Sequence, residues 1–310
     1  MEATVIIDLP DTSTREISKR LVRIREESGL RTIGRVLTLI VVTDHVRGSE
    51  AAIDAANEAS REHPCRVLVV IKGRRADADR LDGQIRVGGD AGAAEVVVLR
   101  TSGAMSSQSA SIVTPLLLPD TPLAVWWPRH SPTHLGQDRV GRLARRRIVD
   151  SDTEGHPTDA LAKRAAGYSP GDTDLAWARI THWRSLLAAT LDSPPYEPIT
   201  RATVCGPERA ASVDLAGGWL ASRLGIDVHR AVGPSMVVLE RASGSIVLEQ
   251  ISPTAAELRI TGQAPTRVAL VGRSVADCLA EELRRMDTDG VYADALANFD
   301  RVIYTSASIR

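Results

Sequence analysis

Four short apolar runs recur in the first 130 residues, each of strand length. They are RVLTLIVVT (35–43), CRVLVVI (65–71), AEVVVLR (94–100) and LAVWW (123–127). Strands that are apolar at consecutive positions are buried on both faces, which is typical of a mostly parallel sheet with helices on each side. Helical patterns lie between or before these runs. The pattern predicts an α/β fold that begins with a three-layer, mostly parallel sheet domain.

Two of these helices can be placed from their residues. Ser13 followed by Glu16 is a capping-box pattern, and Ile17 begins an apolar series at helical spacing that Gly29 can end. The small-residue segment 49–61 is the second helix.

The second half of the chain has a different pattern. Residues 172–192 predict one long helix, whose apolar face consists of Ala176, Ile180, Trp183, Leu187 and Leu191. A strand (TRATVCG), a helix ending at Gly225 and a strand (DVHRAV) follow. Short, partly alternating runs over 235–271 then predict an antiparallel meander covered on one face. A helix beginning at Ser274 and a shorter one complete an α+β domain.

The boundary between these halves is expected in 142–174, where charge, glycine and proline increase and periodicity is lost. A second possible boundary is DSPPYEP (192–198), because its prolines break a helix. We place the two domains at 1–168 and 169–310. Two domains of ordinary size also agree with a chain of 310 residues.

Composition narrows the class of protein. A net charge of −1 gives no sign of a nucleic-acid partner, which usually needs a basic surplus. Cys65, Cys205 and Cys278 lie far apart without a CxxC pair, which predicts free, buried thiols in a reducing compartment. The N-terminus does not resemble a signal peptide, and no apolar run approaches the roughly 18 residues of a membrane span. We expect a soluble, cytoplasmic protein.

Common catalytic motifs are missing from the sequence. It contains no P-loop, GxGxxG, GxSxG or HExxH pattern. Gly88, Gly89 and Gly92 could hold a phosphate, but a strand follows them, which favours a plain turn. His130 and His134 are four residues apart, yet Pro132 prevents a shared helix face, so a metal site is not expected. We predict no catalytic residue, no cofactor and no metal.

The run RVGRLARRR (139–147) contains five arginines in nine residues. Arginines in such a cluster can receive a phosphorylated ligand or an acidic protein surface. Runs of this kind are more often solvated, and solvation is the interpretation that we favour.

The tryptophans are the candidates for molecular recognition. Trp126 and Trp127 point to opposite faces of their strand, so one packs under a helix and the other lies at the strand end where open α/β sheets place their sites. On the helix over 172–192, Trp177 projects about 100° away from the apolar face, beside Arg184. Trp219 is similarly displaced on its own helix. An aromatic side chain beside arginine is typical of protein interfaces, although burial against the other domain is equally compatible with this position.

Several segments together resemble the glucose-6-phosphate dehydrogenase assembly protein family, OpcA. They are DLPDTST (8–14), GRVLTLIVV (34–42), EHPCRVLVV (62–70), GGDAGAAEVVVLR (88–100), TPLLLPDTPLAVWWP (114–128) and SPGDTDLAWARITHWR (169–184). The resemblance covers most of the first two-thirds of the chain and is looser afterwards. It implies a non-catalytic cytoplasmic subunit that binds and activates glucose-6-phosphate dehydrogenase. Some longer relatives are under redox control through a cysteine pair, for which this chain has no counterpart.

The resemblance and the tryptophans together suggest partner-binding residues. They are Trp127, Asp172, Asp174, Trp177, Arg179 and Arg184. If Trp177 contacts the partner, its replacement by alanine weakens the complex and leaves the melting temperature nearly unchanged. The alternative function is a stand-alone α/β enzyme or sensor that binds a small phosphorylated metabolite through the glycines at 88–92 and the arginines at 142–147.

Overall fold

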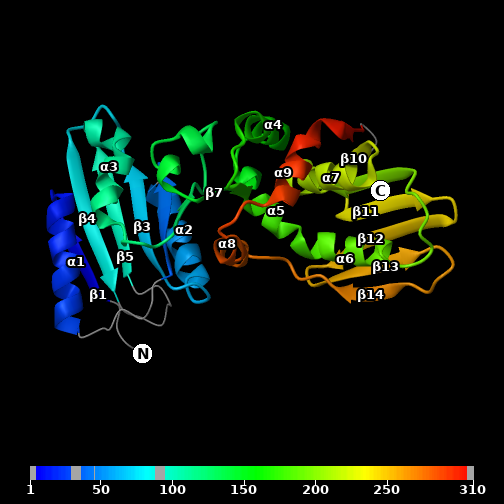
Figure 1. The fold of residues 1–310 in the computed structure, drawn as a ribbon, viewed down its shortest axis with the longest axis horizontal. Helices are drawn as coiled ribbons and strands as arrows, with labels where there is room; N and C mark the ends of the chain where they lie inside the picture. The colour runs from blue at the N-terminus through cyan, green and yellow to red at the C-terminus, as the bar shows by residue number, and fades with distance from the viewer. Residues whose placement is uncertain (1–4, 29–35, 45, 88–94, 306–310) are drawn as a thin grey trace. The chain divides into compact units, whose positions relative to one another are not determined.

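The computed structural model describes residues 5–28, 36–44, 46–87 and 95–305, and has a mixed α/β fold with two mixed sheets (Figure 1). The chain divides into two compact units. The first comprises 1–149, 169–172 and 275–288, and the second comprises 150–168, 173–274 and 289–310. Each unit is therefore assembled from segments that are distant in sequence.

The sheet of the first unit contains all four strands predicted from the apolar runs. Its strand order is β1-β4-β5-β3-β2-β6-β7-β8. The strands are β1 (Val5–Leu9), β2 (Leu37–Thr43), β3 (Cys65–Lys72), β4 (Arg80–Val87), β5 (Glu95–Ser102), β6 (Leu123–Trp126), β7 (Arg146–Val149) and β8 (Asp172–Asp174). The pairs from β5 to β7 are parallel, whereas β4 is antiparallel to both of its neighbours. The chain passes into the second unit within β8.

Helices cover both faces of the inner strands. On one face, α1 (Thr14–Ser28) and α3 (Ser109–Val113) contribute to a core shared with β2, β3 and β5. Apolar residues of α2 (Val46–Ala59), including Ile53, are buried outside that core, and α2 contacts β2 and β3. Against α2 packs α8 (Val275–Arg284), which is over 200 residues later in the sequence. The predicted capping box is confirmed, because Ser13 and Glu16 exchange side-chain to backbone hydrogen bonds of 3.1 and 3.2 Å.

The sheet of the second unit has the order β14-β13-β12-β11-β9-β10-β15. Its strands are β9 (Arg201–Gly206), β10 (Val228–Val232), β11 (Met236–Arg241), β12 (Gly244–Ser252), β13 (Ala255–Ile260), β14 (Thr266–Ala269) and β15 (Val302–Tyr304). The strands β9, β10 and β15 are parallel, and those from β11 to β14 pair antiparallel. The helices are α4 (Pro157–Gly167), α5 (Leu175–Arg179), α6 (Thr181–Leu191), α7 (Ala211–Leu224) and α9 (Gly290–Ala297).

The long helix expected over 172–192 is in fact a short strand and two helices. Asp174 accepts a hydrogen bond from the backbone N–H of Ala176, so it caps α5 and the first helix begins at Leu175. Ile180 separates α5 from α6 with φ −93° and ψ 8°. Gly225 does end α7 as expected, in the left-handed conformation with φ 69°.

Candidate partner-binding site

Asp174 is a fully buried carboxylate in the second unit. It accepts hydrogen bonds from the backbone N–H groups of Ser151 at 3.0 Å and Ala176 at 2.9 Å, and from the Ser151 hydroxyl. Burial, followed by the negative charge of Asp150, raises the pKa of Asp174 to about 7. The hydrogen bonds act in the opposite direction. Asp174 therefore joins the short helical turn Ser151–Thr153 to the start of α5.

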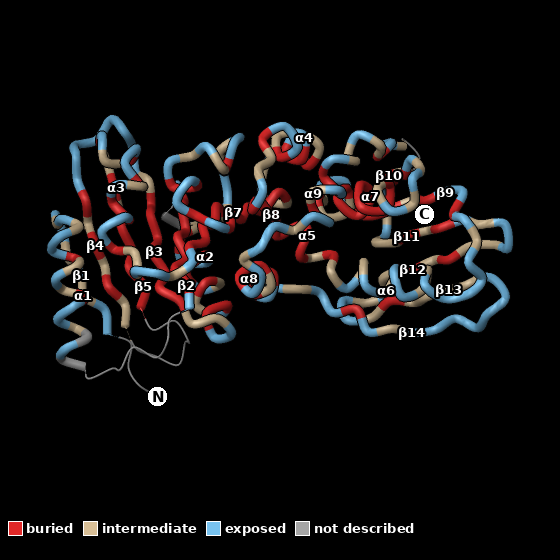
Figure 2. Tube along the Cα trace, in the orientation of Figure 1, coloured by how far each residue is buried: buried red, intermediate tan, exposed pale blue. Residues whose placement is uncertain are grey.

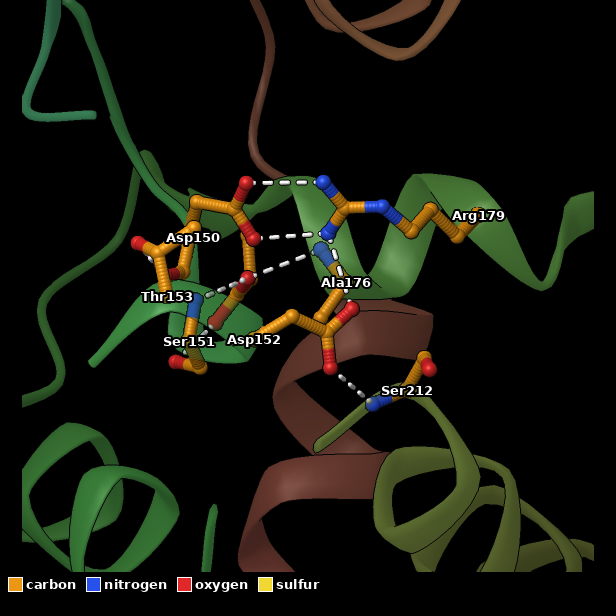
Figure 3. A network of polar contacts seen from close by, with 8 residues as sticks. Asp150, Ser151, Asp152, Thr153, Ala176, Arg179 and Ser212 are labelled. Atoms are coloured by element: carbon orange, nitrogen blue, oxygen red, sulfur yellow. Dashed lines mark hydrogen bonds and ion pairs between the residues drawn. The ribbon is translucent and has the colours of Figure 1, made fainter. Parts of the chain in front are cut away.

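Arg179, at the end of α5, is held by two carboxylates (Figure 3). Its Nη1 and Nη2 donate to the two oxygens of Asp150 at 2.6 and 2.7 Å, and Nη1 also donates to Asp152 at 2.8 Å. The other oxygen of Asp152 accepts the N–H of Ser212 in the first turn of α7, at 3.2 Å. Burial raises the pKa of Asp152, although Arg179 opposes this shift. The side chain of Arg179 remains 22% exposed.

Trp177 lies in the hydrophobic core of the second unit and is 1% exposed. Its Nε1 donates to Asp289 at 2.9 Å, and its ring centroid is 5.9 Å from that of Tyr292. The guanidinium carbon of Arg184 lies 3.6 Å from the centroid of the Trp177 ring, in cation–π geometry. The expected proximity of Trp177 and Arg184 is thus observed, but the tryptophan belongs to the core and does not form a surface.

Trp127 and Asp172 lie in the first unit. Trp127 is 2% exposed within the core that contains α1 and α3. Trp126 is not part of this core, so the two tryptophans point to opposite faces of the sheet, as expected for consecutive strand residues. Asp172 accepts from Nε of Arg147 and from the N–H of Ser169, the latter at 2.8 Å. Both predicted residues are therefore buried within the first unit.

The six predicted residues do not gather into one exposed patch. The structure brings four of them together in the second unit: Asp174, Trp177, Arg179 and Arg184. Of these four, the two arginines keep part of the side chain exposed, while the other two are buried. Partner contact by these residues stays a prediction. In the geometry of this cluster, Arg179 and Arg184 are cations held in fixed orientations, and Asp174 and Trp177 are the buried residues that support them.

The basic run at 139–147 is only partly solvated, in contrast to the expectation from the sequence. Arg139, Arg142 and Arg145 are exposed, but Arg146 and Arg147 are 2% and 7% exposed, so the solvated interpretation is wrong for them. Arg146 forms an ion pair with Glu282 of α8, and Arg147 pairs with Asp172. Both acids lie far from the run in sequence, which is why local composition did not reveal these pairs.

Sequence reasoning missed the acids that position Arg179. Asp150 and Asp152 belong to the segment DSDTEG, whose charge and glycine indicated a boundary between domains. The density of acidic residues was the available signal, but their partner is more than 25 residues away. Gly29 and the glycines at 88–92 lie outside the described residues.

The remaining features considered from the sequence are the cysteines, possible metal ligands and possible membrane spans. The three cysteines are buried and form no disulfide, as expected, and burial raises the pKa of the Cys205 thiol. In the described ranges, no cluster of three or more metal-ligating side chains was found. None of the described helices combines the length and apolar character needed to cross a membrane.

Comparison with known proteins matches two parts of the chain to one family, the glucose-6-phosphate dehydrogenase subunit. The model of its N-terminal domain matches residues 56–166, and the model of its C-terminal domain matches residues 170–296. A Synechocystis protein, named as a candidate OxPP cycle protein OpcA, is 28% identical over 143 residues. This alignment covers 42% of the chain but 29% of the relative, so the chain matches less than a third of that protein's length.

A solved oxidoreductase from Sinorhizobium meliloti covers 86% of both chains at 11% identity. Its TM-score of 0.36 is too low to carry an argument about fold or activity.

The two domain matches occur in the order N-terminal then C-terminal and together extend from residue 56 to 296. The chain belongs to the OpcA family of glucose-6-phosphate dehydrogenase subunits.

Proposed function

We propose that this chain is a non-catalytic, cytoplasmic subunit that binds glucose-6-phosphate dehydrogenase and activates it. The observation that carries the proposal is the match of both family domains, in order, over 56–166 and 170–296. The oxidative pentose phosphate cycle is named for the Synechocystis relative and comes to this chain as part of the proposal.

The arginines of the second unit are the proposed points of contact. Arg179 is held by Asp150 and Asp152, and Arg184 is held against the ring of Trp177. Arginine is enriched at interface hot spots, and an arginine whose geometry is fixed before binding loses less side-chain entropy. Asp174 and Trp177 contribute to binding by supporting these two side chains. This role refines the expectation that they touch the partner themselves.

Trp127 and Asp172 have an analogous supporting role in the first unit. Trp127 fills the core at the end of β6, and Asp172 neutralises Arg147. Because both residues are buried, their replacement would change the backbone geometry and stability of the first unit and would change the partner-binding surface only indirectly.

Activation needs no chemistry in this chain. A protein that prefers the active form of the dehydrogenase shifts the population toward that form. A tenfold preference corresponds to about 1.4 kcal/mol, and by linkage the substrate must then tighten the complex by the same factor. A stable complex of this kind buries about 1,600 Å² in total.

The test is to mix the purified chain with the dehydrogenase of the same organism. We expect co-elution on size-exclusion chromatography and a lower KM for glucose 6-phosphate as the chain is titrated. Arg184→Gln should weaken the complex about tenfold, since it removes one oriented cation, whereas Arg267→Gln on β14 should have no effect. Arg267 is the control because it is exposed and lies outside the cluster.

The proposal fails if mixing changes neither elution nor kinetics. It also fails if the chain alone converts glucose 6-phosphate. A melting curve for each variant separates loss of contact from loss of folding.

A further inference from the structure

The second unit contains a cavity of about 330 Å³. Its walls are formed mainly by α6, α7, the strands β9, β11 and β12, and residues 270–273, all of which belong to this unit. The volume lies within the range of small-molecule pockets, roughly 300–1,000 Å³. Cys205 and Pro207 line the cavity at the carboxyl end of β9, which pairs in parallel with β10. Open α/β sheets bind their ligands at such strand ends, so the position suits a binding site.

The three arginines in the wall of the cavity are engaged by groups of the protein. Two carboxylates bind Arg179, as described above. Arg184 lies against the ring of Trp177, and Arg273 donates from Nη1 to the carbonyl of Ala178 at 2.8 Å. Because these side chains have partners within the unit, their charge does not require an anionic ligand.

The first turn of α7 does not provide an anion site either. The backbone N–H of Ser212 donates to Asp152 at 3.2 Å, and those of Val213 and Asp214 are directed to the carbonyl of Ala210. A phosphate at a helix N-terminus is bound by backbone N–H groups of this kind. Since these three donors are already used, the cavity is better suited to a neutral ligand.

Two indole rings from different helices form part of the wall. Trp183 of α6 is half-buried, and Trp219 of α7 is 7% exposed. Leu187 and Leu270 add aliphatic surface to the lining. An aromatic ligand gains more from indole rings than an aliphatic ligand of equal area, because pairs of rings are stabilised beyond the burial of their surface. The wall therefore favours a flat aromatic ring.

Uncharged polar side chains complete the lining. Gln250 of β12 and Ser235, which precedes β11, both border the cavity, and the Gln250 N–H donates to the Ser235 carbonyl at 2.9 Å. Ser212 adds a hydroxyl group from α7. The carboxamide of glutamine offers a donor and an acceptor side by side, which matches a heterocycle edge that carries both, as in adenine. These groups fit a ring whose edge is polar and uncharged.

We propose that this cavity binds a neutral, flat heteroaromatic ring of the nucleobase type. Trp183 and Trp219 supply the aromatic surface for the ring, and the carboxamide of Gln250 binds its polar edge. The proposal goes beyond the association with a dehydrogenase and does not depend on it.

Binding of three uncharged rings to the purified chain tests the proposal. Adenine, uracil and cytosine each combine a flat ring with a donor and an acceptor at its edge, and isothermal titration calorimetry measures their affinities. We expect at least one of them to bind at a single site with a Kd of about 1 mM or lower. A well-buried ring of about ten non-hydrogen atoms can reach this affinity.

Variants of the lining identify the site. Trp183→Leu should weaken the bound ring about fivefold, because it keeps an apolar side chain and removes the indole, whereas Trp183→Phe should bind within about twofold of the unchanged chain. Gln250→Leu should also weaken it about fivefold, since the carboxamide is lost. Arg267→Gln, which removes an exposed arginine outside the cavity, is the control and should have no effect. Melting curves establish that each variant is folded.

Competition by simple anions separates this proposal from an anion site. Inorganic phosphate and acetate have charge but no ring, and neither should displace the bound ring when added in about tenfold excess over it.

Three outcomes would overturn the proposal. They are the absence of any ring that binds with a Kd of about 1 mM or lower, unchanged affinity in either Trp183→Leu or Gln250→Leu, and displacement of the ring by phosphate or acetate. Since no dehydrogenase is present in this experiment, its result is independent of whether the chain is a dehydrogenase subunit.

Discussion

The two units build their cores from different materials. In the first, β2 is buried at every position (Figure 2). Aliphatic residues of its strands face both sides of the sheet. In the second, β12 has only two buried residues among nine, and an aromatic cluster is formed by Trp177 of α5, Tyr292 of α9 and Tyr168, which follows α4. Apart from Trp126 and Trp127, the first core is filled mainly by aliphatic side chains, whereas the second unit depends on a few large aromatic side chains that also orient polar groups.

The carboxylates with shifted pKa values also differ between the units. In the second unit, burial raises the pKa of Asp152, Asp174 and Asp214. In the first, the hydrogen bonds of Arg86 lower the pKa of Glu50, whose side chain is 53% exposed. The second unit therefore holds carboxylates whose ionisation opposes folding, and their contribution to stability should fall as pH rises.

The largest effect is expected for Trp177→Ala. The substitution removes a buried ring from the aromatic cluster and leaves Asp289 without its indole donor, which should cost about 3–5 kcal/mol of unfolding free energy. Urea unfolding measures this loss. Trp183→Ala, at a half-buried ring, is the control and should cost less. An unchanged melting temperature for Trp177→Ala would contradict its assignment to the core.

A smaller effect should distinguish the two sheets directly. Val41 in β2 is completely buried, and Val247 in β12 is half-buried. Val41→Ala should cost about 2–3 kcal/mol and Val247→Ala about 1 kcal/mol or less, because the second site is already partly solvated. Chemical denaturation of the two variants provides the comparison. Equal losses would show that the half-covered sheet is as tightly packed as the fully covered one.

The smallest effect should appear as a pH dependence at Asp174. An acid whose pKa rises from about 4 unfolded to about 7 folded holds its proton more tightly in the folded state, so stability falls as pH rises between these values. The loss of unfolding free energy should amount to about 1–2 kcal/mol, because the charges of the neighbouring Asp150, Asp152 and Arg179 partly compensate each other. Asp174→Asn should abolish this loss.

The measurement is urea unfolding of both proteins from pH 4 to pH 8. The amide oxygen of asparagine can still cap α5, which makes this variant a fair comparison. Parallel curves for the two proteins would mean that Asp174 titrates normally.

The local sequence pattern predicted much of the fold but little of the candidate site. Consecutive apolar residues identified β2, β3, β5 and β6, and helical spacing brought Trp177 and Arg184 together. The strand β4 was not identified, because its residues alternate and only one face is buried. The acids that hold Arg179 were also missed, since nothing in the sequence near them indicates their partner.

The sequence by itself determined the inner strands, the capping box at Ser13 and the glycine that ends α7. These features depend on interactions between residues a few positions apart, which periodicity and turn chemistry describe. Only the tertiary structure decided that α8 joins the first unit, that Arg146 is buried with Glu282, 136 residues away, and that three arginines line one cavity. Such arrangements depend on which surfaces the folded chain brings together, and the free energy of burial that selects them is shared among residues with no local signature.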